Sequence, residues 1–182
     1  MDVRNRRRLQ AALIAAVFVL PVVVALMLTS TGWVPDGRSY GHPVRPERDL
    51  AAMPVQAASG EPFAWRNDDA VWTLVALPGP GCAEHCLRQL DLVHRAQIAL
   101  GRHADKLRLL YLGARPEAAV AHGFGEVWTL ATTPSDVLAD LRPRTRDSVS
   151  AVLVTPDGKA LTRYAADFDP DGLRQDLAKV VH

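Results

Sequence analysis

Two cysteines offer the chemistry that this sequence supports most directly. Cys82 and Cys86 are the 2 cysteines of the 182-residue chain, and they enclose three residues in the stretch Cys-Ala-Glu-His-Cys. Residues at positions i and i+4 lie on the same face of a helix, so both sulfur atoms can point to one side. Two sulfurs at this spacing can form an intramolecular disulfide or hold a soft ion such as Cu(I).

The position of the pair in the chain favours a reactive role. It follows an apolar run and the turn sequence Pro-Gly-Pro-Gly at 78–81, and apolar residues recur at near-helical spacing after it. The free N–H groups and the positive dipole end of a helix N-terminus stabilise a thiolate. We therefore expect Cys82 to be the attacking thiolate and Cys86 the resolving thiol. The alternative is a static disulfide that only staples the turn, although a loop this short gains little from cross-linking.

The 6 histidines are the natural source of a third copper ligand. On a helix, His85 would lie about 100° around the axis from Cys86, and His94 would lie about 12 Å along it. His122 falls in an expected loop that the fold could bring toward the cysteines. His122 is therefore our candidate for a third metal ligand, beside Cys82 and Cys86 as the candidate catalytic and metal-binding residues.

The elements that must position the cysteines follow from the hydrophobic pattern. Short apolar runs bounded by turn residues predict strands, and apolar residues at helical spacing predict helices between them. The resulting order, β-α-β-(α)-β-α-β-β-α, describes a mixed sheet with helices on both faces, which is an α/β fold of the thioredoxin-like type. The expected strands are 72–77, 107–112, 127–130, 150–154 and 160–164, and the expected helices are 82–100, 116–122, 133–141 and 169–181.

The pattern of charged, apolar, proline and glycine residues places the first 62 residues outside that domain. Four arginines mark residues 1–8, no charged side chain occurs in 9–34, and proline and glycine are frequent in 35–62. An uncharged apolar run of this length fits a membrane span, and its basic flank stays in the cytoplasm. We therefore expect a cytoplasmic basic segment at 1–8, a single transmembrane helix at 9–34, a Pro-rich tether at 35–62 and an extracytoplasmic thioredoxin-like domain at 63–182.

Composition excludes several other classes of protein. The 21 Lys+Arg and 20 Asp+Glu residues give a net charge of +1, which offers no general attraction for nucleic acid. With 48% hydrophobic residues and 2 cysteines, the chain is neither disordered nor a disulfide scaffold. Arg142, Arg144 and Arg146 form a basic stretch that we interpret as a solvated turn.

Taken together, the N-terminal anchor, the tether, the Gly-Cys-x-x-x-Cys motif within Trp72–Leu90 and the late Pro-Asp-Gly-Lys hairpin resemble the Sco/SenC family. More closely, they resemble the proteobacterial thioredoxin-like transmembrane proteins related to it. The resemblance implies copper bound by Cys82 and Cys86 with one distant histidine. The family's histidine precedes a late strand, where this chain reads Thr-Arg-Asp-Ser-Val-Ser-Ala at 145–151. Because that stretch holds no histidine, a dithiol role or two-cysteine Cu(I) binding gains weight.

These features lead to two hypotheses of function. The first, implied by the resemblance, is a single-pass protein of the bacterial inner membrane with a periplasmic domain that helps assemble cytochrome c oxidase. It would act through thiol–disulfide exchange or Cu(I) transfer at Cys82 and Cys86, as an oxidoreductase or a copper chaperone. Its partner would be an oxidase subunit or another copper-site protein. The second is a non-catalytic scaffold of a respiratory complex with a structural Cys82–Cys86 disulfide.

Overall fold

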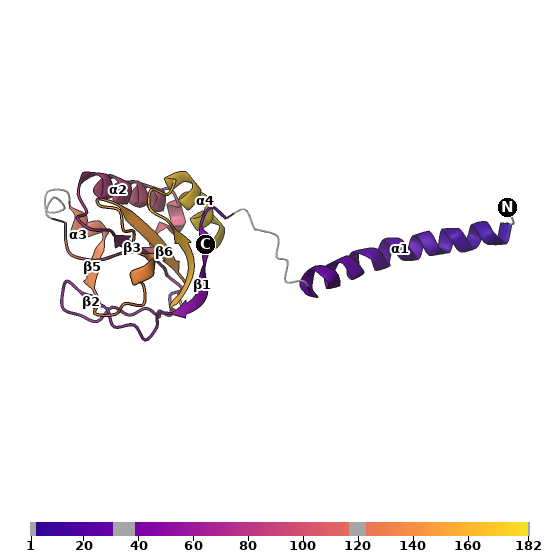
Figure 1. Ribbon diagram of the computed structural model, residues 1–182, viewed down its shortest axis with the longest axis horizontal. Helices are drawn as coiled ribbons and strands as arrows, with labels where there is room; N and C mark the ends of the chain where they lie inside the picture. Colours follow the sequence, from indigo (N-terminus) through magenta and orange to yellow (C-terminus); the bar gives the residue numbers. More distant parts are fainter. Residues whose placement is uncertain (1–2, 31–38, 117–122, 182) are drawn as a thin grey trace. The chain divides into compact units, whose positions relative to one another are not determined.

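The computed structural model describes residues 3–30, 39–116 and 123–181 (Figure 1). The chain divides into two compact units, Met1–Arg38 and Ser39–His182. The first unit contains helix α1, Val3–Ser30, with Pro21 inside it. The second contains the sheet and the other described helices.

Helix α1 includes most of the segment 9–34, for which we expected a membrane span. Among the residues that the structure describes, no helix combines the length and the apolar character needed to cross a membrane. That finding does not support the expected transmembrane helix.

One mixed sheet of seven strands forms the centre of the second unit, within the residues that are described. The order across the sheet is β1-β7-β6-β3-β4-β5-β2. Strand β4 runs parallel to β3 and β5. The pairs β3–β6, β6–β7 and β7–β1 are antiparallel, and so is the pair β5–β2. The strands are β1 (His42–Asp49), β2 (Gln56–Ala57), β3 (Trp72–Pro78), β4 (Leu107–Leu112), β5 (Thr129–Thr132), β6 (Val149–Val154) and β7 (Lys159–Tyr164).

The central strands form where continuous apolar runs predicted them. Every residue of β6 is buried, and so is every residue of β3 after Trp72. A strand buried on both faces reads as an unbroken apolar run, which is why these two are visible in the sequence. The β6–β7 hairpin is also confirmed: Gly158 has a φ of +91°, and the Thr155 N–H donates to the Lys159 carbonyl at 2.9 Å.

The helices confirm the sequence prediction in part. The described helices are α2 (Glu84–Ile98), α3 (Phe124–Val127) and α4 (Pro170–Val180), with 3-10 helices η1 (Gly101–Lys106) and η3 (Ala139–Leu141). Helix α4 begins as predicted, because the Asp169 carboxylate accepts the N–H of Asp171 and Gly172. The helix expected at 133–141 is wrong in extent. Side chains bond locally there instead, with Thr133 Oγ1 accepting the Ser135 N–H at 3.1 Å.

The two faces of the sheet are covered differently. Helices α2 and α4 pack on one face, where Leu90, Val93, Leu173 and Leu177 join one buried cluster (Figure 1). The opposite face is covered mainly by irregular chain and by η3. Its second cluster takes Leu50, Met53, Val55, Trp65, Leu138 and Leu141 from those segments. The sheet is therefore flanked by helices as expected, but the longer helices of this unit share one face.

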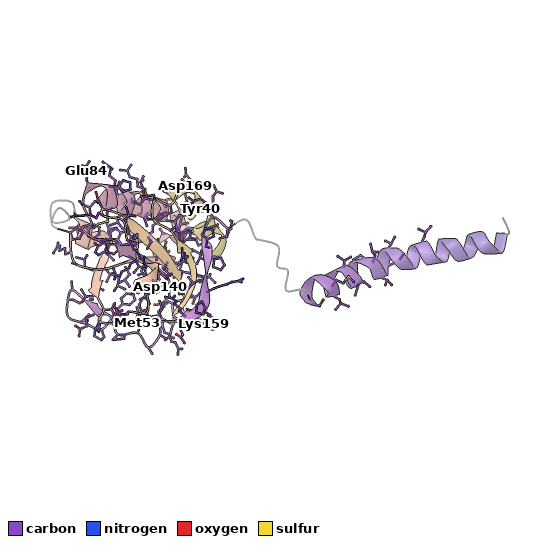
Figure 2. The ribbon with its side chains drawn as sticks, in the orientation of Figure 1. Tyr40, Met53, Glu84, Asp140, Lys159 and Asp169 are labelled. Atoms are coloured by element: carbon purple, nitrogen blue, oxygen red, sulfur yellow. A yellow bond between two sulfur atoms is a disulfide. The ribbon has the colours of Figure 1, made fainter. Side chains whose placement is uncertain are left out.

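The expected tether at 35–62 is corrected by the structure, which places its described part, from Ser39 on, in the folded unit. The buried carboxylate of Asp176 in α4 accepts the Ser39 hydroxyl at 2.9 Å and the Gly41 N–H at 2.8 Å. The Tyr40 hydroxyl accepts the Asp169 N–H at 2.8 Å, and Figure 2 shows these two residues close together. Strand β1 then pairs with β7. The proline spacing did not reveal these contacts with α4 because their partners lie 129 to 137 residues away.

Candidate functional site: a disulfide at the sheet edge

A disulfide joins Cys82 and Cys86 at the start of α2, with 5.2 Å between their Cα atoms. Strand β3 ends at Pro78, the turn 79–81 follows, and α2 begins at Glu84. Cys82 therefore lies just before the helix and Cys86 in its first turn. Cys82 is partly exposed, whereas Cys86 is completely buried in the cluster beneath α2. The two sulfurs are brought together as the spacing suggested, but only Cys82 is accessible from outside.

Asp147, which precedes β6, caps the N-terminus of α2. Its carboxylate accepts the backbone N–H of Ala83 at 2.7 Å, of Cys86 at 3.0 Å and of His85 at 3.1 Å. The bond from Cys86, followed by those from His85 and Ala83, holds the pKa of Asp147 below its ordinary value despite the opposing effect of desolvation. The N–H groups that we expected to stabilise a thiolate are thus already bonded to a carboxylate.

Glycine at position 79 lets the Asp147 loop approach the cysteine turn. A Cβ atom on Gly79 would overlap the Thr145 carbonyl oxygen, so any larger residue must push the loop away. The Gly79 N–H donates to the Ser148 carbonyl at 2.8 Å, and the Asp147 N–H donates to the Pro80 carbonyl at 3.0 Å. These bonds hold Asp147 at a φ of +52°, a left-handed conformation that aspartate tolerates better than most residues.

Two clefts flank the start of α2. The Cys82 cleft, of about 540 Å³, is lined by Pro78, Cys82, Tyr111, Gly113, Arg115 and Arg142 among others. The α2 groove, of about 570 Å³, runs along the helix and is lined by apolar side chains such as Leu87, Phe124 and Trp128 and by charged or polar residues of α2. The exposed sulfur belongs to the first of these and not to the second.

Arg142 contributes a fixed positive charge to the Cys82 cleft. Its Nη2 donates to the Leu112 carbonyl at 2.7 Å and its Nη1 to the Pro78 carbonyl at 3.3 Å, at the ends of β4 and β3. Burial lowers the pKa of Arg142, and the same cause raises the pKa of Tyr111 to about 12. The interpretation of a solvated basic turn is therefore corrected for Arg142, whereas Arg144 and Arg146 are exposed as expected.

The histidines do not form a copper site within the described residues. His85 Nε2 lies 2.7 Å from Asp167 Oδ1, in an exposed pair, and His103 accepts a hydrogen bond from Arg102. His94 lines the α2 groove. His122, our candidate for the third ligand, lies outside the described residues. In the part of the chain that is described, no group of three or more His, Cys, Asp or Glu side chains could hold a metal ion.

Sequence reasoning missed Asp147, Arg142 and Tyr111 as neighbours of the cysteines. In the sequence, the stretch 145–151 is distinguished only by its lack of a histidine. In the structure, Asp147 of this stretch bonds to the start of α2. The topology could have indicated that these residues come together. The C-terminal ends of β3 and β4 and the N-terminal end of β6 lie at the same edge of the sheet. This inference requires the strand order, which the sequence pattern does not provide.

Several solved structures share this fold. BsSco, named as a member of the Sco family of cytochrome c oxidase assembly proteins, matches 78% of this chain and 96% of its own at 15% identity, with a TM-score of 0.52. Yeast Sco1 with copper bound matches 76% and 90% at 13% identity, with a TM-score of 0.51. An uncharacterized thioredoxin-like protein from Porphyromonas gingivalis matches 71% and 90% at 13% identity, with a TM-score of 0.52. At these identities the likeness is one of fold.

The family is shown by a match in sequence. The comparison with curated proteins gave no significant match. Residues 72–182, from the start of β3 onward, match the family model described as "Transmembrane-like, thioredoxin-like, C-terminal domain". This segment contains the cysteine pair, Asp147 and the lining of the Cys82 cleft. The chain therefore belongs to the transmembrane-like, thioredoxin-like C-terminal domain family.

Proposed function

We propose that this chain carries out thiol–disulfide exchange through Cys82 and Cys86. The observation that supports this most directly is the unequal exposure of the pair. Cys82 is accessible at the Cys82 cleft, whereas Cys86 is 0% exposed. Exchange with a partner needs one accessible sulfur for the intermolecular step and a second sulfur that reacts within the protein. Cys82 and Cys86 fit these two roles in that order.

In the reducing direction, the Cys82 thiolate attacks one sulfur of a partner disulfide, and the partner's other sulfur leaves as a thiolate. Cys86 then loses its proton and attacks Cys82 Sγ, which breaks the mixed disulfide and releases the partner's second thiolate. The partner gains two electrons and, on protonation, two protons. The Cys82–Cys86 disulfide of the structure is the oxidised product of this sequence.

The proposed setting is the periplasmic side of a bacterial inner membrane, in the assembly of cytochrome c oxidase. The basic segment 1–8 and the uncharged run 9–34 support membrane attachment. Described apolar side chains of α1 such as Val17 and Phe18 are 68% and 73% exposed, and exposed apolar surface of this kind favours burial against lipid or protein. The oxidase link is supported by the fold shared with BsSco.

Cu(I) transfer is a second candidate, with the ion as cargo. The two sulfurs are close enough to bond to each other, so the reduced pair could bind one Cu(I) between two thiolates. A neighbour in fold, yeast Sco1, has copper bound. The nearest histidine in sequence, His85, is paired with Asp167. A two-sulfur site therefore fits the described residues better than a three-ligand one.

Trapping a mixed disulfide tests the exchange proposal. We expect the reduced Cys86→Ala chain to form a covalent adduct with a fluorescent peptide disulfide, because Cys82 attacks and no resolving thiol releases it. The matched Cys82→Ala chain keeps one cysteine but should form no adduct, since Cys86 is buried. Alanine is preferred to serine because Cys86 lies in an apolar cluster, where a hydroxyl would be unsatisfied. Equal adducts on both variants, or none on either, would contradict the proposal.

The reduction potential separates exchange from a scaffold with a structural disulfide. Structural disulfides have potentials below about −300 mV, whereas exchange proteins lie at roughly −270 to −120 mV. We expect the full chain, equilibrated with glutathione redox buffers, to fall in the second range. A value below the first limit would favour the scaffold.

Copper titration tests the second candidate. The reduced chain should bind one Cu(I) in competition with a chelator, and the Cys82→Ala, Cys86→Ala double variant should bind none. Retained binding in the double variant would remove the cysteines from any copper role. A His122→Ala variant should bind like the unmodified chain if two sulfurs suffice.

A further inference from the structure

The Cys82 cleft contains two arginines as well as the exposed sulfur. Arg115 and Arg142 line it together with Cys82, and the described lining residues include no acidic side chain. Within the described part of the chain, neither guanidinium forms an ion pair. The carboxylate bonded to this turn, Asp147, accepts three backbone N–H groups and is not among the residues that line the cleft. The described lining of the cleft is therefore positively charged.

Arg142 is held in place at this site. Its two bonds to the carbonyls of Pro78 and Leu112 fix the guanidinium at the ends of two adjacent strands. A guanidinium has five N–H donors in a rigid fork, so donors remain for another acceptor. Fixed arginines suit carboxylates because two parallel hydrogen bonds can form without much loss of side-chain freedom.

Tyr111 gives the cleft an unused polar group. Its side chain is completely buried, it lines the Cys82 cleft, and its hydroxyl has no hydrogen-bond partner among the described residues. Most buried polar side-chain atoms in proteins are paired. The hydroxyl remains protonated at neutral pH, so it is available as a donor to an acceptor that enters the cleft.

We propose that the Cys82 cleft binds a carboxylate carried by the exchange partner next to its reacting sulfur. Arg142 and Arg115 would hold the carboxylate, with Tyr111 as a further donor. The inference rests on the proposed exchange reaction and names its substrate class, which is an acidic thiol or its disulfide. The carboxylate can belong to a small thiol acid or to an acidic residue beside a cysteine in a protein.

The test follows reduction of the oxidised full chain by thiols. A thiolate attacks Cys82 Sγ, the Cys82–Cys86 bond breaks, and Cys86 leaves as a thiolate that takes up a proton. A second thiolate then attacks the partner's sulfur in the mixed disulfide and releases Cys82. Two thiols become one disulfide, and the chain gains two electrons.

Two matched pairs of probes distinguish the sources of the carboxylate. The first pair is 3-mercaptopropionate against 2-mercaptoethanol, and the second is an Asp-Cys against an Asn-Cys peptide. Rates are expressed per thiolate, and the measured quantity is the ratio of acidic to neutral probe. Each ratio is compared among the unmodified chain, Arg142→Gln, Arg115→Gln and the control Arg102→Gln. Arg102 lies in η1, which precedes β4, whereas the cleft lies where β4 ends.

We expect the ratio to fall about tenfold in Arg142→Gln and about threefold in Arg115→Gln, and to stay unchanged in Arg102→Gln. Thermal melting checks the fold of Arg142→Gln, because Arg142 also bonds two strand carbonyls. Arg115 is exposed, so its variant tests the site without that dependence.

The possible outcomes distinguish failure of the proposed carboxylate site from failure of the proposed exchange function. Equal ratios in all four proteins would overturn the carboxylate site while leaving exchange intact, since both probes would still react. No reaction with any probe would overturn the exchange function itself. A preference confined to the peptide pair assigns the carboxylate to a protein partner, and one confined to the small thiols assigns it to a thiol acid; both support the site.

Discussion

The carboxylate of Asp147 accepts the backbone N–H of Cys86 at 3.0 Å, from a loop 61 residues further along the chain. The loop before β6 thus caps the cysteine helix and also places a negative charge beside the cysteine pair. A nearby carboxylate disfavours a second negative charge on a thiolate. Asp147 should therefore stabilise the disulfide relative to the reduced pair. The chain should then be a stronger reductant than it would be without this cap on α2.

Replacing Asp147 with asparagine should raise the reduction potential of the pair. The amide keeps the size of the side chain but removes the charge, so the reduced thiolate becomes more stable. We expect a rise of roughly 10–30 mV, where 29.6 mV is a tenfold change in the exchange constant. Redox titration against glutathione measures it, with Asp91→Asn, further along α2, as the control for loss of one charge. An unchanged or lower potential in Asp147→Asn would contradict the charge effect.

Asp176 should make the free energy of unfolding of the second unit depend on pH. Burial by itself raises the pKa of Asp176, but bonds from Lys179, Gly41 and Ser39 outweigh it and hold the pKa below the ordinary 3.8. A carboxylate whose pKa is lowered by folding stabilises the folded state at pH values above its ordinary pKa. This contribution is lost as the pH falls through the folded-state pKa. We expect Asp176→Asn to lower the free energy of unfolding by about 2 kcal/mol at pH 7.

The difference between Asp176→Asn and the unmodified chain should shrink below pH 4. Urea unfolding at a series of pH values measures this, because subtraction removes the shared titration of the other carboxylates. A difference that stays constant down to pH 3 would show that the carboxylate charge does not stabilise the contact with Ser39 and Gly41.

The sequence predicted the central strands because burial on both faces leaves a readable apolar run, as in β3 and β6. It predicted the start of α4 because Asp169 and Pro170 act within one turn. It failed where the stabilising partner is distant in sequence: Ser39 and Gly41 depend on Asp176, and the cap of α2 comes from Asp147. The cysteines were identified by type and spacing alone, whereas the charges around them depend on strand order.

Substituting alanine for Gly172 should destabilise the fold, although alanine is the better helix former. In an exposed helix this change adds about 1 kcal/mol of stability. A Cβ on Gly172 would overlap the ring of Tyr40, so the sign should reverse to a loss of about 1–3 kcal/mol. Gly125→Ala in α3, where the new Cβ would lie 4.0 Å from Arg115 Nη2, serves as the control. Stabilisation by Gly172→Ala, measured by urea unfolding, would mean that Tyr40 does not pack on α4.

Burial should also make the two cysteines unequal in their effect on stability. Cys82→Ala and Cys86→Ala both remove the disulfide, which the loop-closure model values at about 2 kcal/mol for so short a loop. Only Cys86 fills space in the buried cluster beneath α2, so its loss also leaves a cavity. We expect Cys86→Ala to be less stable than Cys82→Ala by about 1 kcal/mol. Urea unfolding of the two variants, beside the reduced unmodified chain, isolates this difference because the lost cross-link cancels. Equal stabilities would indicate that Cys86 is no better packed than Cys82, and the assignment of Cys86 as the protected, resolving sulfur would lose its physical basis.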